Sequence, residues 1–360
     1  MKFLDATRAY EIWLRGQIDV VEADLAQKHR KMADSAFTFL RATFYRWVPR
    51  WLEACAELAT APTVLAVGDL HVENFGTWRD SEGRLAWGVN DFDEATVMPY
   101  TIDLVRLATS ALLAREQQNF RLSDKAICDA ILDGYRTQLK TGGAPFVLEE
   151  DHGPLRAAAL STERDPLNYW QKLEALRTVK AVSAMRHLLT AELPAGTENI
   201  RIVHRTSGAG SLGRPRFVAL GKLNGANVAR EAKAMLPSAY TWSTGGTATR
   251  LRCKELDRRA IRSHDPYMSL SGRWLIRRLG PRCSRIELKM LPEDYDERYF
   301  LEAMGRETAN VHWGTPSAIE AIQAHLRRQK TGWLARAAKT MLKLVLTDWS
   351  TWRDYSARRW

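Results

Sequence analysis

Two acidic segments dominate this sequence: Val67-Gly68-Asp69-Leu70-His71-Val72-Glu73-Asn74-Phe75 and Gly88-Val89-Asn90-Asp91-Phe92-Asp93-Glu94. Mg²⁺ prefers a few carboxylate or carbonyl oxygens as ligands, together with phosphate oxygens. From the spacing we expect Asn74 and Asp91 to be magnesium ligands and Asp69 to face a hydroxyl that attacks a phosphate. Phosphoryl transfer is therefore the first functional hypothesis.

The flanking segments predict two strands that would place these residues together. Residues 63–67 form a short apolar run, and residues 84–89 alternate in polarity before Asn90. Residues 79–83 have the composition of a turn. We expect the two strands to form a hairpin with Asp69, Asn74 and Asp91 at one end. The alternative is that these residues are ordinary polar loop residues with capping roles.

A second enzyme class shares part of this pattern. Gly-Asp-x-His, here Gly68 to His71, also opens metal-dependent phosphoesterase sites. Such sites need further Asp, Asn and His ligands, typically in Gly-Asn-His settings, and the chain contains no Gly-Asn-His. The phosphoesterase hypothesis is thus a minor alternative. His71 lies inside the acidic loop and is expected to orient Asp69 or a phosphate.

Residues 99–113 predict a helix, because apolar residues recur at helical spacing from Leu104 to Leu112. Asp103 lies near its start, where an acid can cap free N–H groups. The alternative role for Asp103 is a buried brace of the catalytic loop, and the two roles are compatible. Asp93, Asp103 and Arg106 are taken as supporting residues.

A glycine-rich loop lies much later in the chain, at Ser207-Gly208-Ala209-Gly210-Ser211-Leu212-Gly213. The spacing Gly-x-Gly-x-x-Gly is shared with dinucleotide-binding folds. Here, however, apolar runs at 200–203 and 214–220 predict a strand on each side, which is the arrangement of kinases. We expect Gly208, Gly210, Ser211 and Gly213 to bind the phosphates of ATP. A turn at Asn224-Gly225 then leads to Lys233, which is expected to contact ATP.

The order of these motifs is unusual. In an ordinary kinase the glycine loop and the lysine precede the catalytic aspartate, whereas Asp69 precedes Gly208 here. If both halves form one site, the chain is circularly permuted, which is tolerable when the original termini lie close together at the surface. In a closed state, Lys233 nitrogen and the Asp91 carboxylate should approach within roughly 10 Å.

The chain resembles the bacterial domain-of-unknown-function family 2252 (DUF2252), an uncharacterised group similar to the protein-kinase-like and aminoglycoside phosphotransferase superfamily. The resemblance covers most of the chain, and its first block is specific. It rests on residues 30–41, 68–76, 90–94, 103–107, 208–213, 230–233, 274–279 and 309–312.

The resemblance implies a kinase-like site with Asp69, Asn74 and Asp91 in the acidic roles, but no particular substrate. Two departures affect the implied activity. Leu70-His71 stands where protein kinases have an Arg-Asp lead-in, and no glutamate is clearly placed to pair with Lys233. Glu255, in a possible helix over 253–262, is the candidate partner.

Composition and charge narrow the classes of protein. The chain has 360 residues, of which 45% are hydrophobic and 26% charged, so it can bury one large core or two lobes. It has no apolar run of about 20 residues and no secretory signal, so a cytoplasmic location is expected. The four scattered cysteines suggest neither a zinc ribbon nor a disulfide framework.

The net charge of +11 is concentrated between Arg250 and Lys289. A basic region of this kind attracts polyanions and would steer ATP or an acidic substrate towards the protein. Nucleic acid is an unlikely partner by this reasoning, because no zinc finger, ribonucleoprotein motif or basic heptad pattern accompanies the charge.

We therefore predict an α+β protein with a two-lobed, protein-kinase-like fold in circularly permuted order. Residues 1–192 would form a helical large lobe with the catalytic hairpin, including an amphipathic helical segment over 36–58. Residues 193–290 would form a small antiparallel β-rich lobe, and helices over 291–360 would complete the large lobe.

The predicted function is an ATP- and Mg²⁺-dependent phosphotransferase that acts on a small-molecule or protein hydroxyl. Transfer of the nucleotidyl group in place of the γ-phosphate is an open variant. A non-catalytic nucleotide-binding or interaction module on the same fold is the competing class.

Overall fold

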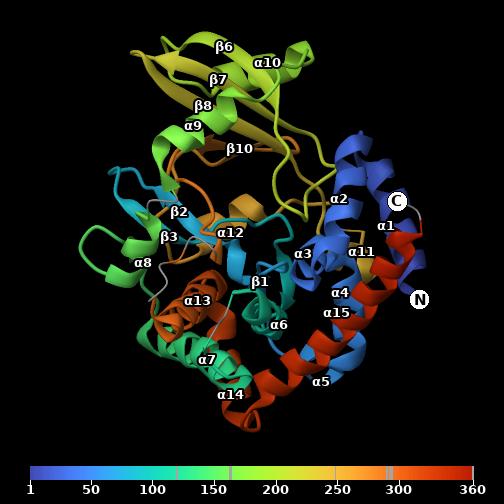
Figure 1. Ribbon diagram of the computed structural model, residues 1–360. Helices are drawn as coiled ribbons and strands as arrows, with labels where there is room; N and C mark the ends of the chain where they lie inside the picture. The colour runs from blue at the N-terminus through green and yellow to red at the C-terminus, as the bar shows by residue number, and fades with distance from the viewer. Residues whose placement is uncertain (119–120, 162–163, 248, 289–290, 292–294, 359–360) are drawn as a thin grey trace.

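A computed structural model describes the protein at residues 1–118, 121–161, 164–247, 249–288, 291 and 295–358 (Figure 1). Lys289, the end of the basic region, lies outside these ranges. So do residue 290, where the β-rich lobe was predicted to end, and the last two residues, Arg359 and Trp360.

The N-terminal end of the chain is helical. Its elements are α1 (Phe3–Gln17), α2 (Glu22–Asp34), α3 (Ala36–Ala42), α4 (Phe44–Ala54) and α5 (Ala56–Ala59). Ser35 caps α3 by accepting a hydrogen bond from Thr38 N. The helical segment expected over 36–58 is divided into three, because Thr43 and Cys55 have non-helical backbone angles. Trp47 and Trp51, four residues apart on α4, stack in the core.

Two small antiparallel sheets carry the acidic segments. The first pairs β1 (Thr63–Ala66) with β4 (Thr96–Pro99), and the second has the order β2 (Phe75–Arg79), β3 (Leu85–Val89), β5 (Phe146–Val147). The predicted hairpin between residues 63–67 and 84–89 is therefore wrong. After β1 the chain turns at Gly68, whose φ is +87°, and the 3-10 helix η1 (Val72–Asn74) precedes β2. This leaves β2 as the hairpin partner of β3.

A five-stranded antiparallel sheet lies at the opposite end of the molecule from α14 (Figure 1). Its strands are β6 (Glu198–His204), β7 (Arg216–Leu223), β8 (Ala226–Ala234), β9 (Ser269–Ser271) and β10 (Trp274–Leu279), in the spatial order β6-β7-β8-β10-β9. The predicted turn between β7 and β8 is confirmed: Asn224 and Gly225 both have positive φ, as a two-residue hairpin of this type requires.

Helices cover both faces of this sheet. Met185 and Leu189 of α10 (Ser183–Ala191) pack on Ile202, Ala219 and Ala232. On the other face, α9 (Pro166–Glu174) packs Leu173 against apolar residues of four strands, namely Val203, Val218, Leu220, Ala229 and Leu279. The alternating burial of β-strand side chains explains the two separate clusters.

Long helices form the rest of the body: α6 (Thr101–Gln118), α7 (Asp124–Thr141), α13 (Glu297–His312), α14 (Ile319–Arg328) and α15 (Trp333–Ala357). Shorter elements are α8 (Gly153–Ala159), α11 (Ala239–Ser243), α12 (Cys253–Arg259) and η4 (Pro316–Ala318). The backbones of helices α7 and α13 approach each other closely where the two helices cross. A Cβ atom added at Gly305 would lie 2.0 Å from Ile131 O, so only glycine permits this crossing.

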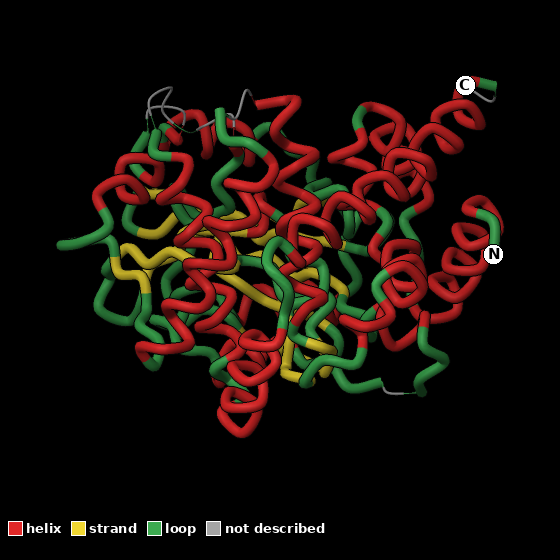
Figure 2. The backbone as a smooth tube through the Cα atoms, turned by 90° about the horizontal axis from the view of Figure 1, so that it is seen from below, coloured by secondary structure: helices red, strands yellow, loops and turns green. Residues whose placement is uncertain are grey.

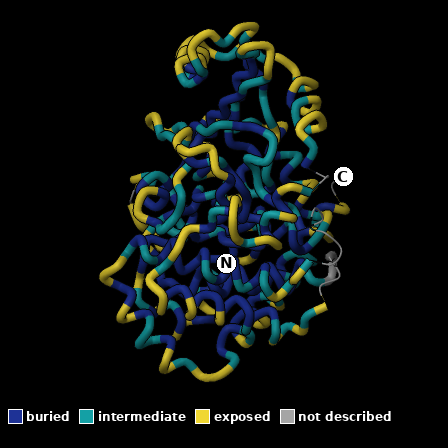
Figure 3. Tube along the Cα trace, turned by 90° about the vertical axis from the view of Figure 1, so that its left-hand side faces the viewer, coloured by how far each residue is buried: buried dark blue, intermediate teal, exposed yellow. Residues whose placement is uncertain are grey.

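Seen from below in Figure 2, helices make up most of the near side of the molecule, and the strands lie behind them. Buried segments concentrate in the helical body beneath the five-stranded sheet (Figure 3). The fold is thus α+β, as predicted. Cys55, Cys128 and Cys253 are buried, and all four cysteines are free thiols. Among the described helices, none has the length and apolar character needed to cross a membrane.

Candidate active site

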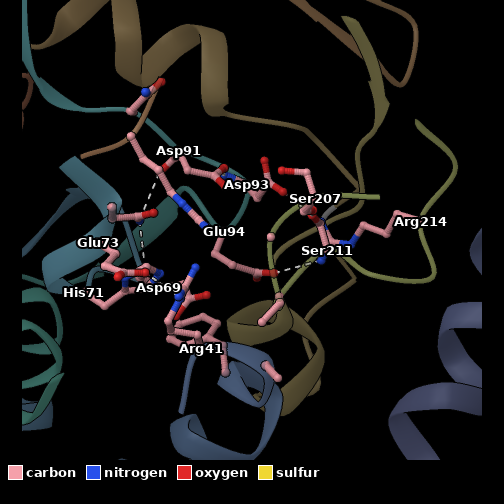
Figure 4. A pocket seen from close by; sticks show the side chains of 18 of the residues that line it. Arg41, Asp69, His71, Glu73, Asp91, Asp93, Glu94, Ser207, Ser211 and Arg214 are labelled. Carbon is pink, nitrogen blue, oxygen red and sulfur yellow. Dashed lines mark hydrogen bonds and ion pairs between the residues drawn. The ribbon is translucent and has the colours of Figure 1, made fainter. Parts of the chain in front are cut away.

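A cavity of about 260 Å³ brings the acidic segments and the glycine loop together (Figure 4). Its walls include Asp69, Asn74 and Asp91 from the acidic segments and Gly208, Gly210 and Ser211 from the loop between β6 and β7. Helices α1 to α4, α9 and α11, strand β10 and the segment that follows β10 also contribute to the lining. The structure therefore places motifs from distant parts of the sequence around a single space.

Asp69 is held on one side by a fully buried arginine. Arg106 Nε donates to Asp69 Oδ1 at 2.7 Å, and Arg106 also donates to Leu40 O and lies over the rings of Phe44 and Trp47. Burial raises the pKa of Asp69 to about 7, and Arg106 opposes that shift while Glu94 adds to it. Arg106 thus supports Asp69 through a direct hydrogen bond, as expected. The other carboxylate oxygen, Asp69 Oδ2, lies on the side of the glycine loop.

Asn74 and Asp91 each keep one side-chain oxygen that accepts no hydrogen bond from an N–H group of the described residues. Asn74 Nδ2 donates to Asp69 O at 3.0 Å and to Asp91 O at 3.4 Å, which fixes the amide and leaves Oδ1 available. Asp91 Oδ1 accepts from Lys233 Nζ and Asp93 N, which leaves Oδ2. A carboxylate and an amide oxygen of this kind suit Mg²⁺, whose remaining ligands would be water and phosphate.

No group of three or more His, Cys, Asp and Glu side chains that could hold a metal ion occurs within the described ranges. A site with one carboxylate and one amide ligand contains only one side chain of these four types, so it is not a group of this kind. Phosphate oxygens of a bound ligand would have to complete it.

Lys233 reaches the acidic segment from β8. Its Nζ lies 3.2 Å from Asp91 Oδ1 and also contacts Asp93 Oδ1, so the predicted approach within roughly 10 Å is confirmed. Burial would raise the pKa of Asp91, but Lys233 and nearby arginines outweigh it and hold that pKa below its usual range. Burial and the Asp91 charge raise the pKa of Asp93 to about 6.

The glycine loop lies directly over Asp69. A Cβ atom added at Gly210 would lie 2.9 Å from Arg41 O and 3.6 Å from Asp69 Oδ2. Lys28 Nζ of α2 donates to Gly210 O at 3.2 Å. Gly213 behaves differently from its neighbours, because it packs against Leu25 of α2 and does not contribute to the cavity lining.

Asp103 braces the acidic loop. Its carboxylate accepts from Val67 N at 2.8 Å and Gly68 N at 2.7 Å, and from His312 Nε2 at 3.0 Å. Tyr135 hydroxyl contacts the other ring nitrogen of His312 at 2.8 Å. All of these side chains are fully buried. Of the two roles expected for Asp103, the brace is observed directly.

His71 makes no hydrogen bond to Asp69, so its expected orienting role towards Asp69 is wrong. The ring packs edge-on against Phe37, and its Nδ1 is buried without a hydrogen-bond partner in the described part of the chain. Burial, together with the charges of Arg41, Arg106 and Arg285, keeps the pKa of His71 well below its usual range. The imidazole is therefore neutral.

Glu255 is not the partner of Lys233. Its carboxylate pairs with Arg250, Arg252 and Arg259 around α12. The carboxylates that contact Lys233 are Asp91 and Asp93, which reach it from the loop after β3. The proposed lysine–glutamate pair is therefore replaced by a lysine–aspartate cluster.

Several residues in the cavity wall, and one buried behind it, were not found from the sequence. Glu231 has no exposed surface and accepts hydrogen bonds from Arg205, Arg216 and Arg277. It lies two residues before Lys233, so both side chains point to the same face of β8. Side chains alternate between the two faces of a strand, so the spacing of two residues from Lys233 was the sequence signal that could have identified Glu231. Other unpredicted lining residues are Lys28, Arg41, Glu73, Glu94 and Arg214.

The fold and the cavity define an α+β protein with a polar cavity lined by charged side chains. Residues 20–151 match the family model described as "Uncharacterized protein conserved in bacteria (DUF2252)". The match includes the acidic segments and α6 and ends before the five-stranded sheet, and over these residues it supports the resemblance found in the sequence. Comparisons with curated proteins and with solved structures found no match.

Proposed function

We propose that this protein is a Mg²⁺-dependent phosphotransferase that uses a nucleoside triphosphate, expected from the sequence to be ATP, to phosphorylate a hydroxyl group. The acceptor is a small molecule or a protein. The single observation that carries the proposal is the 3.2 Å contact between Nζ of the buried Lys233 and Oδ1 of Asp91, a residue of the cavity wall. It joins a lysine of the sheet to the candidate metal ligand.

The arrangement of the sheet supports a kinase-like small lobe. The glycine loop joins the first two strands of the sheet, β6 and β7, and Lys233 lies on the third, β8. Kinases use a glycine-rich loop over the phosphates and a lysine on their third strand. Because Asp69 precedes this sheet in the chain, we propose a circularly permuted, two-lobed organisation in which the helical body is the large lobe.

The roles of the residues follow from their contacts. Asn74 Oδ1 and Asp91 Oδ2 would hold Mg²⁺, which when bound neutralises phosphate charge. Lys233 would exchange an aspartate for phosphate oxygens, and the amides around Gly208 and Gly210 would donate to them.

Asp69 would act at the acceptor. The acceptor oxygen forms a bond to the γ-phosphorus, the bond from that phosphorus to the bridging oxygen breaks, and the nucleoside diphosphate leaves. Asp69 Oδ2 takes the proton of the hydroxyl, while Arg106 keeps Oδ1 in place.

The alternative functions predict different experimental results. A non-catalytic nucleotide-binding module would bind the same ligand without turnover, and nucleotidyl transfer would move the α-phosphate. The phosphoesterase hypothesis is less favoured, because the chain has no Gly-Asn-His and the glycine loop and Lys233 have no role in it.

The test is incubation with ATP radiolabelled at the α or the γ position, with and without Mg²⁺ and with a metabolite pool. The proposal predicts Mg²⁺-dependent movement of the γ label to an acceptor. Movement of the α label would establish nucleotidyl transfer. If neither label moves while ATP still raises the melting temperature, the protein is a binding module and the proposal fails.

A further inference from the structure

A buried carboxylate joins three arginines in one wall of the cavity. Glu231 Oε1 accepts from Arg216 Nη1 at 3.0 Å and Arg277 Nε at 3.1 Å, and Oε2 accepts from Arg205 Nη1 at 2.6 Å. Burial would raise the pKa of Glu231, but the arginines outweigh it and hold it well below its usual range. The carboxylate is therefore ionised and enclosed.

The register of the sheet places this cluster next to the phosphate-binding residues. Lys233 is opposite Arg216 on β7, whereas Glu231 is opposite Val218 on β7 and Arg277 on β10. Residues two apart on a strand lie on one face, separated by about 6.6 Å. If Lys233 contacts the phosphates of a nucleotide, the row that contains Glu231 and Arg277 is the neighbouring row on the same face, where the base of that nucleotide could reach it.

The apolar part of the same face is already covered. Leu173 of α9 packs against Val218, Leu220 and Ala229, which leaves little flat apolar strand surface on which a base could lie. Tyr169, also from α9, lines the cavity beside Leu279 and Cys283. The part of the sheet that remains open to the cavity is consequently the arginine cluster together with Leu279 at the end of β10.

The open side of this cluster supplies hydrogen-bond donors. Arg205 and Arg277 line the cavity, with 22% and 24% of their side-chain surface exposed. A guanidinium group has five N–H donors and no acceptor, so donors remain after the bonds of both arginines to Glu231 and of Arg277 to Asn90. Glu231, with no exposed surface, cannot offer an acceptor to a ligand.

From this geometry we propose that the nucleotide site selects a 6-oxopurine, so that the phosphate donor is a guanine nucleotide in preference to ATP. The proposal rests on the function proposed above and names its donor. Arginine donates in a bidentate manner to guanine O6 and N7. Adenine presents an amino donor in place of O6, which would face another donor and lose its hydrogen bond to water.

The experiment measures the binding of β,γ-imido analogues of GTP, ITP and ATP to the full chain in Mg²⁺, by calorimetry. ITP keeps O6 and N7 but lacks the 2-amino group of guanine, so it isolates the proposed contact. We expect the GTP and ITP analogues to bind with similar affinity, each at least about ten-fold more tightly than the ATP analogue.

A variant and its control locate the effect. Arg205→Gln leaves Arg216 and Arg277 on Glu231 and should reduce the preference for GTP over ATP several-fold. Arg258→Gln removes the same charge from an exposed position on α12 and should leave the preference unchanged. Inorganic tripolyphosphate, which carries no base, should compete weakly with the GTP analogue.

The outcomes separate the two proposals. Equal or tighter binding of the ATP analogue overturns the inference but leaves the phosphotransferase proposal standing. Tripolyphosphate binding as tight as that of the GTP analogue also overturns it, because the arginines would then bind phosphate. If no nucleotide binds, the phosphotransferase proposal fails, and the inference fails with it.

Discussion

Lys233 Nζ lies 3.2 Å from Asp91 Oδ1, although 142 residues separate them in the chain. The lysine comes from the central strand of the five-stranded sheet and the aspartate from the loop after β3. With Asp93, they form a compact charge cluster in which the lysine is almost fully buried. In the proposed function, Asp91 would bind the metal ion and Lys233 would bind the phosphates, so both residues would contact the same metal–nucleotide ligand.

The metal site predicts the behaviour of Asp91→Asn and Asn74→Ala. Each variant should keep its fold but lose the Mg²⁺-dependent part of the stabilisation by nucleotide, because a metal ligand is removed. For the unaltered protein, a nucleotide at 100 times its Kd should add about 2.7 kcal/mol to the free energy of unfolding. Thermal melts with and without Mg²⁺ measure the difference.

The matched control for the metal site is Asp133→Asn, at an exposed carboxylate paired with Arg298. It should retain the full Mg²⁺ effect. If Asp91→Asn and Asn74→Ala retain it as well, Mg²⁺ is held elsewhere.

Asp69→Asn should separate binding from turnover. The asparagine cannot take the proton of the acceptor, and general-base catalysis is typically worth about 10² to 10⁴ in rate. Binding of Mg²⁺-nucleotide should change little, because Asp69 is assigned to the acceptor. Parallel measurement of γ-label transfer and of nucleotide affinity tests this, and an equal loss in both would argue against separate roles.

The brace beneath the acidic loop should carry much of the local stability. Asp103→Ala removes the acceptor of Val67 N and Gly68 N and leaves His312 without its carboxylate partner. We expect a loss of about 3 kcal/mol or more in the free energy of unfolding, since buried donors become unsatisfied. Urea denaturation measures it. Asp129→Ala, at an exposed pair with Lys125, should change the same quantity by less than about 0.5 kcal/mol.

The glycine loop predicts that turnover depends on Gly210 but not on Gly16, a glycine outside the loop. Gly210→Ala would push a Cβ atom to 2.9 Å from Arg41 O, so the loop must move away from Asp69, and turnover should fall about ten-fold or more. Gly16→Ala, in α1 with nothing within 4 Å, should leave turnover unchanged and raise stability by about 0.5–1 kcal/mol. Normal turnover in Gly210→Ala would show that the loop does not take part.

Local patterns were sufficient to predict several elements. The helix that carries Asp103, the turn at Asn224 and Gly225, and the placement of the glycine loop between two strands all depend on near neighbours in sequence. The approach of Lys233 to Asp91 was predicted from the chemistry of a shared phosphate ligand and not from propensity.

Strand pairing and ion-pair partners could not be predicted in the same way. The run at 63–67 pairs with β4, because Gly68 and η1 separate it from β2. The sequence of a short β-strand does not show which other strand it pairs with. The enclosure of Glu231 depends on Arg216 of β7, Arg277 of β10 and Arg205, which directly follows β6, and these meet only in the folded sheet. Likewise, Glu255 carries the charge needed to pair with Lys233, but its position on α12 places its carboxylate next to arginines instead.

The most direct test of the account is a crystal structure of the protein with Mn²⁺ and non-hydrolysable analogues of GTP and ATP. The account predicts an anomalous metal peak within about 2.3 Å of Asn74 Oδ1 and Asp91 Oδ2, with the phosphates between Lys233 and the glycine loop. A metal ion and nucleotide bound outside this cavity, or a cavity that stays empty at saturating nucleotide, would contradict it.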